Sequence, residues 1–139
     1  MKLSYVAIAG VCVIIIGFCS CKKKHDASPQ SNLIGKWKQV MVVADSNGNG
    51  VWDVHDAVDS INTDIVLDFS SGGAGTIFQT NISIGTFSWE LLTNNTYLKT
   101  TYPTSVGSAI QHIDSLTAKT LVLKDTTGIS IMWNVFAKQ

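Results

Sequence analysis

Short runs of alternating apolar and polar residues dominate the chain after residue 32. Phe87, Trp89 and Leu91, for example, alternate with Ser88 and Glu90, which is the period of a strand that buries one face. Similar runs predict eight strands, over 36–44, 64–69, 75–80, 87–91, 97–102, 109–116, 120–124 and 129–137. The apolar spacing of 109–116 also fits a short helix.

Clusters of Gly, Asn, Asp and Thr separate these runs, as expected of turns. The stretch Asp125–Gly128 predicts a hairpin with its glycine at a positive φ. On the first strand we expect Trp37, Met41 and Val43 to share one face. Eight strands at hairpin spacing, with no helical interlude, predict an all-β domain. The expected fold is an antiparallel meander that closes as an up-and-down barrel, with a β-sandwich as the alternative.

Residues 1–20 follow a different pattern. Lys2 is followed by an unbroken apolar and small run from Val6 to Phe18. This run has the length of a signal-peptide core and is shorter than the ~20 residues that span a bilayer. The small residue Ser20 precedes Cys21, which predicts cleavage between them. Cleavage before Cys19 would follow the bulky Phe18, and a retained membrane span is the other alternative.

The Ser20–Cys21 junction resembles the lipobox of bacterial lipoproteins. The resemblance implies that the thiol of Cys21 carries covalent lipid such as palmitate, and that the acyl chains bind the outer membrane of the cell envelope. Lys22–Lys24 would add attraction to an anionic surface. Nothing in the sequence separates the periplasmic face from the cell surface. The expected organisation is a signal peptide (1–20), a lipidated cysteine with a flexible tether (21–31), and one domain (32–139).

Composition excludes several functions for this domain. The three cysteines of the 139-residue chain, Cys12, Cys19 and Cys21, all precede it. The domain therefore has no internal disulfide, thiolate metal site or cysteine nucleophile. The chain has no arginine and the lysines of the domain are scattered, which argues against a nucleic-acid partner.

The first predicted strand begins with the pattern Gly35-x-Trp37. With Thr86–Trp89 and the run from Ile113 to Leu123, it resembles the small lipocalin-like domains of bacterial lipoproteins. The resemblance implies a barrel whose Trp37 packs across the closed end, beneath a basic residue near the last strand. Lys138 is the only late basic residue. The alternative is that Trp37 is an ordinary core aromatic.

The segment 45–56 (DSNGNGVWDVHD) resembles the calcium loop of an EF-hand. Ca²⁺ takes six to eight oxygen ligands, and Gly50 permits the required sharp turn. Asp56 stands where Glu is usual, which favours weak affinity, near ~10⁻⁴–10⁻³ M. We expect a structural clip, with a metal-free Asn/Gly turn as the alternative. The expected ligands are Asp45, Asn47, Asn49, the carbonyl of Val51, Asp53 and Asp56.

Support for catalysis is weak. His112 and Asp114 fall on one face of a predicted strand, but neither Ser108 nor Ser115 is placed as a nucleophile. The only glutamate, Glu90, has no evident partner except Asp68, which nothing places beside it.

We therefore expect no catalytic residues and a binding role. Trp52, Trp89 and Trp133 either line a pocket or pack in the core, and Trp52, inside a polar loop, would suggest a protein or glycan contact if exposed. The sequence predicts an exported lipoprotein that binds a small apolar ligand or an envelope protein. The alternative is an adaptor whose barrel is fully packed and holds no ligand.

Overall fold

The computed structural model describes residues 28–59, 64–103 and 107–139. The predicted signal peptide, the lipid attachment at Cys21 and residues 22–27 of the tether lie outside the described residues. Among those that are described, no helix is long and apolar enough to cross a membrane.

The regular secondary structure of the described residues is almost entirely strand. Its elements are the helix α1 (Pro29–Leu33) and the strands β1 (Gly35–Ala44), β2 (Ala57–Asp59), β3 (Ile65–Phe69), β4 (Ala74–Gln79), β5 (Ile82–Leu92), β6 (Tyr97–Thr101), β7 (Ser108–Leu116), β8 (Thr120–Asp125) and β9 (Met132–Lys138). The segment that also fitted a helix, 109–116, is strand β7.

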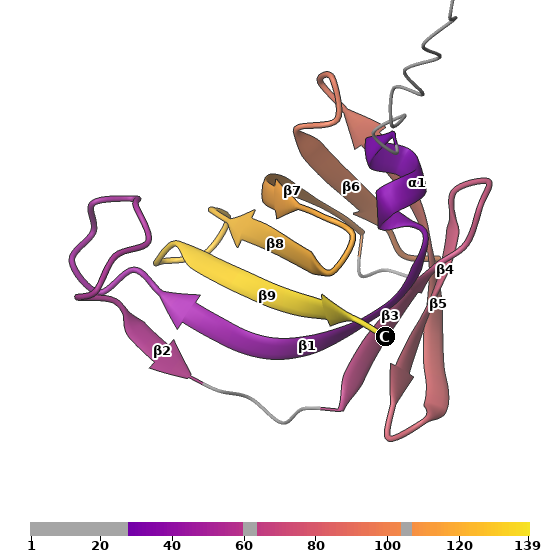
Figure 1. The fold of residues 1–139 in the computed structure, drawn as a ribbon, viewed down its shortest axis with the longest axis horizontal. Coiled ribbons are helices and arrows are strands. Elements are labelled where there is room, and N and C mark those ends of the chain that lie inside the picture. Colours follow the sequence, from indigo (N-terminus) through magenta and orange to yellow (C-terminus); the bar gives the residue numbers. More distant parts are fainter. Residues whose placement is uncertain (1–27, 60–63, 104–106) are drawn as a thin grey trace, which may run out of the picture.

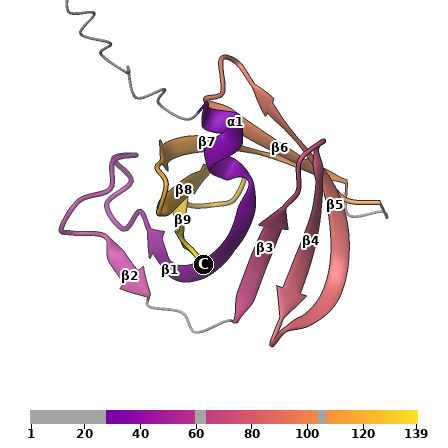
Figure 2. The ribbon, with the colours of Figure 1, turned by 45° about the vertical axis from the view of Figure 1, so that its right-hand side comes forward.

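These strands form a closed antiparallel barrel. From β3 to β9 each strand pairs with the next along the chain, β1 pairs with β3, and β9 returns to pair with β1 (Figures 1 and 2). Eight strands close the barrel, and the short β2 adds to the far half of β1. The prediction of an up-and-down barrel is confirmed, and the sandwich alternative is wrong.

One large cluster of buried side chains fills the interior. Its members come from strands all around the barrel, and only side chains that point inward can meet in this way. The cluster comprises Leu33, Trp37, Phe69, Phe87, Trp89, Leu98, Leu121, Leu123 and Phe136. Leu33 belongs to α1, so this helix covers the interior cluster at one end of the barrel, which we call the closed end (Figure 1).

A second, smaller cluster lies on the outer face. Val122 belongs to it, whereas its neighbours Leu121 and Leu123 belong to the interior, as strand alternation requires. Its buried members are Val43, Val122, Trp133 and Val135. The barrel wall therefore buries apolar side chains on both of its faces along β1, β8 and β9.

A bulge in β1 corrects the expectation for the first strand. The register of β1 against β9 shifts between Gln39 and Met41, so that one residue is added to β1. Trp37 therefore points into the barrel, while Met41 and Val43 pack in the outer cluster. The shared face predicted for these three residues is wrong, because alternation fails across a bulge.

Three further local features differ from expectation. Residues 29–31, placed in the tether, form the first turn of α1, where the Ser28 hydroxyl accepts a hydrogen bond from the Ser31 N–H. Strand β2 was not predicted. Gly128 has no positive φ, and β9 begins only at Met132, so the turn after β8 is longer than the predicted hairpin.

Candidate functional site

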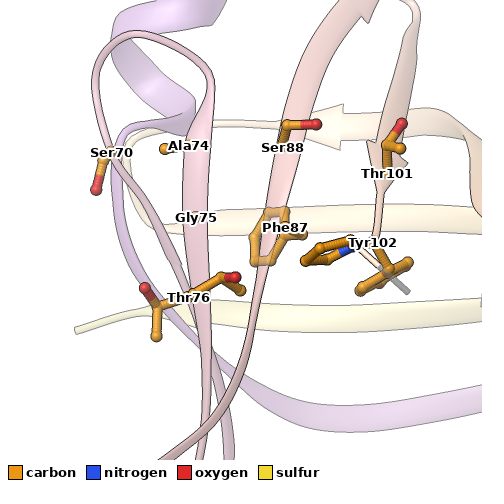
Figure 3. Close-up of a pocket in the computed structure, with 10 residues that line it drawn as sticks. Ser70, Ala74, Gly75, Thr76, Phe87, Ser88, Thr101 and Tyr102 are labelled. Atoms are coloured by element: carbon orange, nitrogen blue, oxygen red, sulfur yellow. The ribbon is translucent and has the colours of Figure 1, made fainter.

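A pocket of about 420 Å³ opens where β4, β5 and the end of β6 meet (Figure 3). The rings of Phe87 and Tyr102 form its apolar wall, with their centroids 6.2 Å apart. Serine and threonine side chains surround these rings. The lining residues are Ser70, Ala74, Gly75, Thr76, Thr86, Phe87, Ser88, Thr101, Tyr102 and Pro103. The pocket thus combines an apolar wall with hydroxyl groups that can donate or accept hydrogen bonds.

The position of Phe87 depends on Gly75. The two residues are opposite each other in the β4–β5 ladder, and a Cβ on Gly75 would lie only 2.2 Å from Cζ of Phe87. Phe87 is 5% exposed, and its ring meets the ring of Phe69 edge-on, with the ring centroids 5.3 Å apart. The pocket wall is therefore continuous with the interior cluster, and the missing side chain at Gly75 makes room for it.

The closed end is built around Trp37, which is fully buried. Its indole N–H donates to the Leu33 carbonyl at 2.7 Å. The Lys138 ammonium lies 5.0 Å from the centre of the Trp37 ring and donates to the Asn32 carbonyl at 2.8 Å. Gly35, at φ 121°, leaves room for Lys138, whose Cε is 3.0 Å from where a Cβ would be. A lysine thus occupies the place over the tryptophan that the lipocalin resemblance gives to a basic residue.

The segment 45–56 forms a loop ordered by its own side chains. The two carboxylate oxygens of Asp45 accept the N–H groups of Gly48 and Gly50, at 2.7 and 2.8 Å. Both glycines have φ 72°, a conformation that side-chain-bearing residues rarely adopt. Because Asp45 is only 8% exposed, its carboxylate forms the buried base of the loop.

The carboxylate of Asp53 accepts hydrogen bonds from three other residues of the loop. The side-chain amides of Asn47 and Asn49 reach it at 3.2 and 2.8 Å, and the His55 N–H at 2.8 Å. The His55 N–H, followed by the Asn49 amide, lowers the pKa of Asp53 from 3.8 to about 2. The oxygens of Asn47 and Asn49 in turn accept the N–H groups of Asn49 and Val51.

Asp56 joins the two ends of the loop. It accepts the N–H groups of Ser46 at 3.2 Å and Asp53 at 2.8 Å, and it is 8% exposed. The carboxylates of Asp45, Asp53 and Asp56 thus all accept hydrogen bonds from N–H groups of the loop. Within the described residues, no group of three or more His, Cys, Asp or Glu is arranged to hold a metal ion. The calcium ligand set therefore stays a prediction.

The loop packs onto the outer cluster. Lys124 donates to the Gly50 carbonyl at 2.6 Å, and its ammonium lies 5.3 Å from the centre of the Trp133 ring. The centre of the Trp52 ring lies 6.4 Å from the centre of the Trp133 ring, and Trp52 is 40% exposed. Sequence reasoning missed Lys124, because nothing in its own strand indicates that a loop 74 residues earlier lies above it.

His112 and Asp114 do lie together on the outer face. Nδ1 of His112 is 2.6 Å from Asp114, whose other oxygen accepts the indole N–H of Trp133, also at 2.6 Å. Ser108 lies four residues from His112 along β7, roughly 13 Å at strand spacing. The register shift in β7 sets His112 opposite Lys124 and Ser115 opposite Val122, so Ser115 shares the outer face with His112, roughly 7 Å along the ladder. The hydrogen-bonding side chain that His112 contacts is Asp114. The pair is tied to a buried tryptophan, a connection that the sequence did not indicate.

The remaining predicted residues have structural partners. Trp89 and Trp133 are core residues of the interior and outer clusters. Glu90 forms an ion pair with Lys99 at 2.7 Å. Asp125, predicted only as a turn residue, accepts hydrogen bonds from the hydroxyl and the N–H of Thr127, and these bonds lower its pKa.

A closed antiparallel barrel of eight strands with one covered end defines the class of this fold. The chain is similar to a lipocalin-like protein from Bacteroides uniformis, with a TM-score of 0.56 and 13% identity over 78% of this chain and 99% of that one. It is also similar to an uncharacterized protein from Bacteroides eggerthii, with a TM-score of 0.53 and 16% identity over 76% and 98% of the two chains. At these identities the likeness shows the fold. No protein-family model and no curated protein matches the sequence.

Proposed function

We propose that this protein is an exported bacterial lipoprotein, anchored in the outer membrane by acyl chains on Cys21, whose barrel is a non-catalytic binding module. The pattern of residues 1–21 supports the anchor, and the lipocalin-like fold supports the module. Each buried methylene contributes ~0.8 kcal/mol, so several acyl chains on one residue hold a domain at a bilayer.

The anchor has a direct test. Cells fed an alkyne analogue of palmitate are expected to label the wild-type protein and the Cys19→Ser variant, but not Cys21→Ser. The Cys19→Ser variant is the matched control, because it removes a thiol two residues away. Label that persists in Cys21→Ser contradicts the proposed attachment site.

The pocket bounded by Phe87 and Tyr102 carries the proposal of a ligand. Its volume of about 420 Å³ falls within the ~300–1,000 Å³ of small-molecule sites. An apolar wall bordered by hydroxyl groups suits a small apolar molecule with one polar end. Burial of its apolar part would supply most of the affinity, and the hydroxyl groups would orient the polar end.

Native mass spectrometry tests this site. The Cys21→Ser protein, purified without its acyl chains, is expected to retain an apolar small molecule or to bind added dodecanoic acid. Thr86→Trp, which fills the pocket, should lose that mass. Ile82→Trp, at an exposed position of the same strand that does not line the pocket, should keep it. Identical spectra for the two variants contradict a ligand in this pocket.

The second candidate is an adaptor that binds only protein. Nine buried side chains, several of them aromatic, fill the barrel interior, and this density favours a packed barrel. Ligand-free wild-type spectra would favour this candidate. A broad hydrolase screen examines catalysis, and turnover abolished by His112→Ala would contradict both candidates.

We also propose that the 45–56 loop holds a structural Ca²⁺. The residues fit the ion in type, because a carboxylate or amide oxygen that accepts one N–H retains a lone pair for a cation. Millimolar CaCl₂ should raise the melting temperature, EGTA should reverse the rise, and Asp45→Ala should abolish it. Asp59→Ala, in the adjacent β2, is the control that should retain the response. No shift with CaCl₂ contradicts the site.

A further inference from the structure

The 45–56 loop contains both Asn-Gly pairs of the chain, Asn47–Gly48 and Asn49–Gly50. Asparagine followed by glycine is chemically labile, because glycine has no side chain to hinder attack by its own backbone nitrogen on the preceding side-chain amide. Both asparagines are exposed to water, and Figure 1 shows their loop at the margin of the barrel, between β1 and β2. Burial therefore does not protect either pair.

The reaction open to such a pair is deamidation through a cyclic imide. The glycine nitrogen loses its proton and forms a bond to Cγ of the asparagine, while the bond from Cγ to Nδ2 breaks. The amide group leaves as ammonia and takes the glycine proton with it. Water then opens the ring at either carbonyl and gives aspartate or isoaspartate. The attacking nitrogen must first be deprotonated, so whatever holds the glycine N–H controls the rate.

Asp45 binds both of the nitrogens that would attack. Its two carboxylate oxygens accept the N–H groups of Gly48 at 2.7 Å and Gly50 at 2.8 Å. Hydrogen bonds from an N–H to a carboxylate are stronger than neutral ones, and deprotonation would set a negative nitrogen directly against the negative carboxylate. A carboxylate is also too weak a base to take up the proton. Asp45 therefore opposes the first step of deamidation at both pairs.

The two pairs are not held equally. The side-chain amide of Asn49 donates to Asp53 at 2.8 Å, whereas that of Asn47 does so at 3.2 Å. The carbonyl of Gly50 accepts the Lys124 ammonium at 2.6 Å, which ties the second pair to the barrel wall. Gly48 has no atom within 4 Å of its Cβ position. Asn47–Gly48 is therefore the pair that separates from Asp45 more readily.

We propose that Asn47 is a deamidation site protected by Asp45. Asn47 is converted to aspartate or isoaspartate when the Gly48 N–H leaves the Asp45 carboxylate, and Asn49 follows more slowly. The product cannot rebuild the loop, because a carboxylate then faces Asp53 in place of the amide that donates to it. Deamidation is thus an irreversible consequence of loop opening.

Peptide mass spectrometry of the full-length protein, incubated folded or in urea at mildly alkaline pH, tests this site. Each product is detected as the exchange of an amide NH for O, and all samples contain EGTA, so that the rates describe the metal-free loop. In the folded protein we expect Asn47 to deamidate several-fold faster than Asn49. Both rates should be at least roughly tenfold lower than in urea, because unfolding removes the charge-assisted bond to each glycine N–H. In urea the two rates should be similar.

Three variants separate Asp45 from the rest of the loop. Asp45→Ala should raise both rates roughly tenfold or more, and the Gly48 N–H should then exchange faster with solvent deuterium. Asp53→Ala removes the partner of the two side-chain amides but leaves both glycine N–H groups on Asp45, so it should raise the rates by a clearly smaller factor. Asp59→Ala, in the adjacent β2, is the matched control and should leave both rates unchanged.

Several outcomes would overturn the proposal. They are a folded protein that deamidates as fast as the chain in urea, equal rates at Asn47 and Asn49 in the folded protein, and an acceleration by Asp53→Ala or Asp59→Ala as large as that by Asp45→Ala. If Asp45→Ala does not fold, the wild-type protein carries the test, since a Gly48 N–H that exchanges as fast folded as in urea contradicts the protecting contact. These rates depend on neither calcium nor acylation, so their failure leaves the proposed function untouched.

Discussion

Replacing Gly75 with alanine should destabilise the barrel far more than the same change at Gly85. A Cβ on Gly75 would lie 2.2, 2.4 and 2.8 Å from three ring carbons of Phe87, and contacts this short force the ring to move. Overpacking costs ~1–3 kcal/mol, and a displaced Phe87 also weakens its edge-on contact with Phe69, worth ~0.5–1.5 kcal/mol. We expect Gly75→Ala to cost about 2–4 kcal/mol.

Gly85 is the matched control, because it lies on the neighbouring strand with no atom within 4 Å of its Cβ position. Gly85→Ala should be neutral or stabilise by up to ~1 kcal/mol, since alanine restricts the unfolded chain.

Urea denaturation measures the free energy of unfolding of both variants, each made in the non-acylated Cys21→Ser protein. In thermal denaturation, the melting temperature of Gly75→Ala should fall by roughly 10–20 °C. The cost should shrink in a Phe87→Leu background, because the smaller side chain removes the clash. The reasoning is refuted if Gly75→Ala and Gly85→Ala differ by less than ~0.5 kcal/mol.

Three further predictions concern buried or coupled polar groups. Trp37→Phe removes the donor to the buried Leu33 carbonyl and should cost about 1–3 kcal/mol in urea denaturation; a cost near zero contradicts the role of this bond. The pKa of Asp53, lowered from 3.8 to about 2, means that its contribution to stability is present above pH 3.8 and lost as pH falls through about 2. NMR titration in EGTA should show the lowered pKa of the Asp53 carboxyl. Asp53→Asn should remove the loss of stability that occurs as the pH falls from 3.8 to about 2. Asp114→Ala leaves the indole N–H of Trp133 without its acceptor, so it should cost less in a Trp133→Phe background, as a double-mutant cycle would show.

Most strands could be predicted because each carries its signal locally. The alternation of Phe87, Trp89 and Leu91 reports one buried face wherever the strand finally pairs. The bulge in β1 could not be read in this way, since it depends on how β9 aligns against it. The same holds for α1, whose five residues are too few for a periodic signal and whose Leu33 is buried only because the barrel end receives it.

The candidate sites likewise divide into those with a local sequence signal and those that depend on how the strands pair. The segment 45–56 is recognisable because its Asp, Asn and Gly residues follow one another in sequence, and the structure forms a compact loop there. The pocket of Phe87 and Tyr102 lies where three consecutive strands meet, and the alternation within each strand does not show that their residues enclose a cavity. Lys138 over Trp37 spans 101 residues, and only the lipocalin resemblance pointed toward it.

The sequence by itself determined the all-β class, the positions of eight strands, the loop at 45–56 and a single basic residue near the last strand, because these follow from side-chain period and residue type. Only the tertiary structure decided which face each half of β1 buries and where the pocket opens. The physical reason is barrel closure. When β9 pairs with β1, the register of that last ladder brings distant residues together, and local propensity carries no information about it.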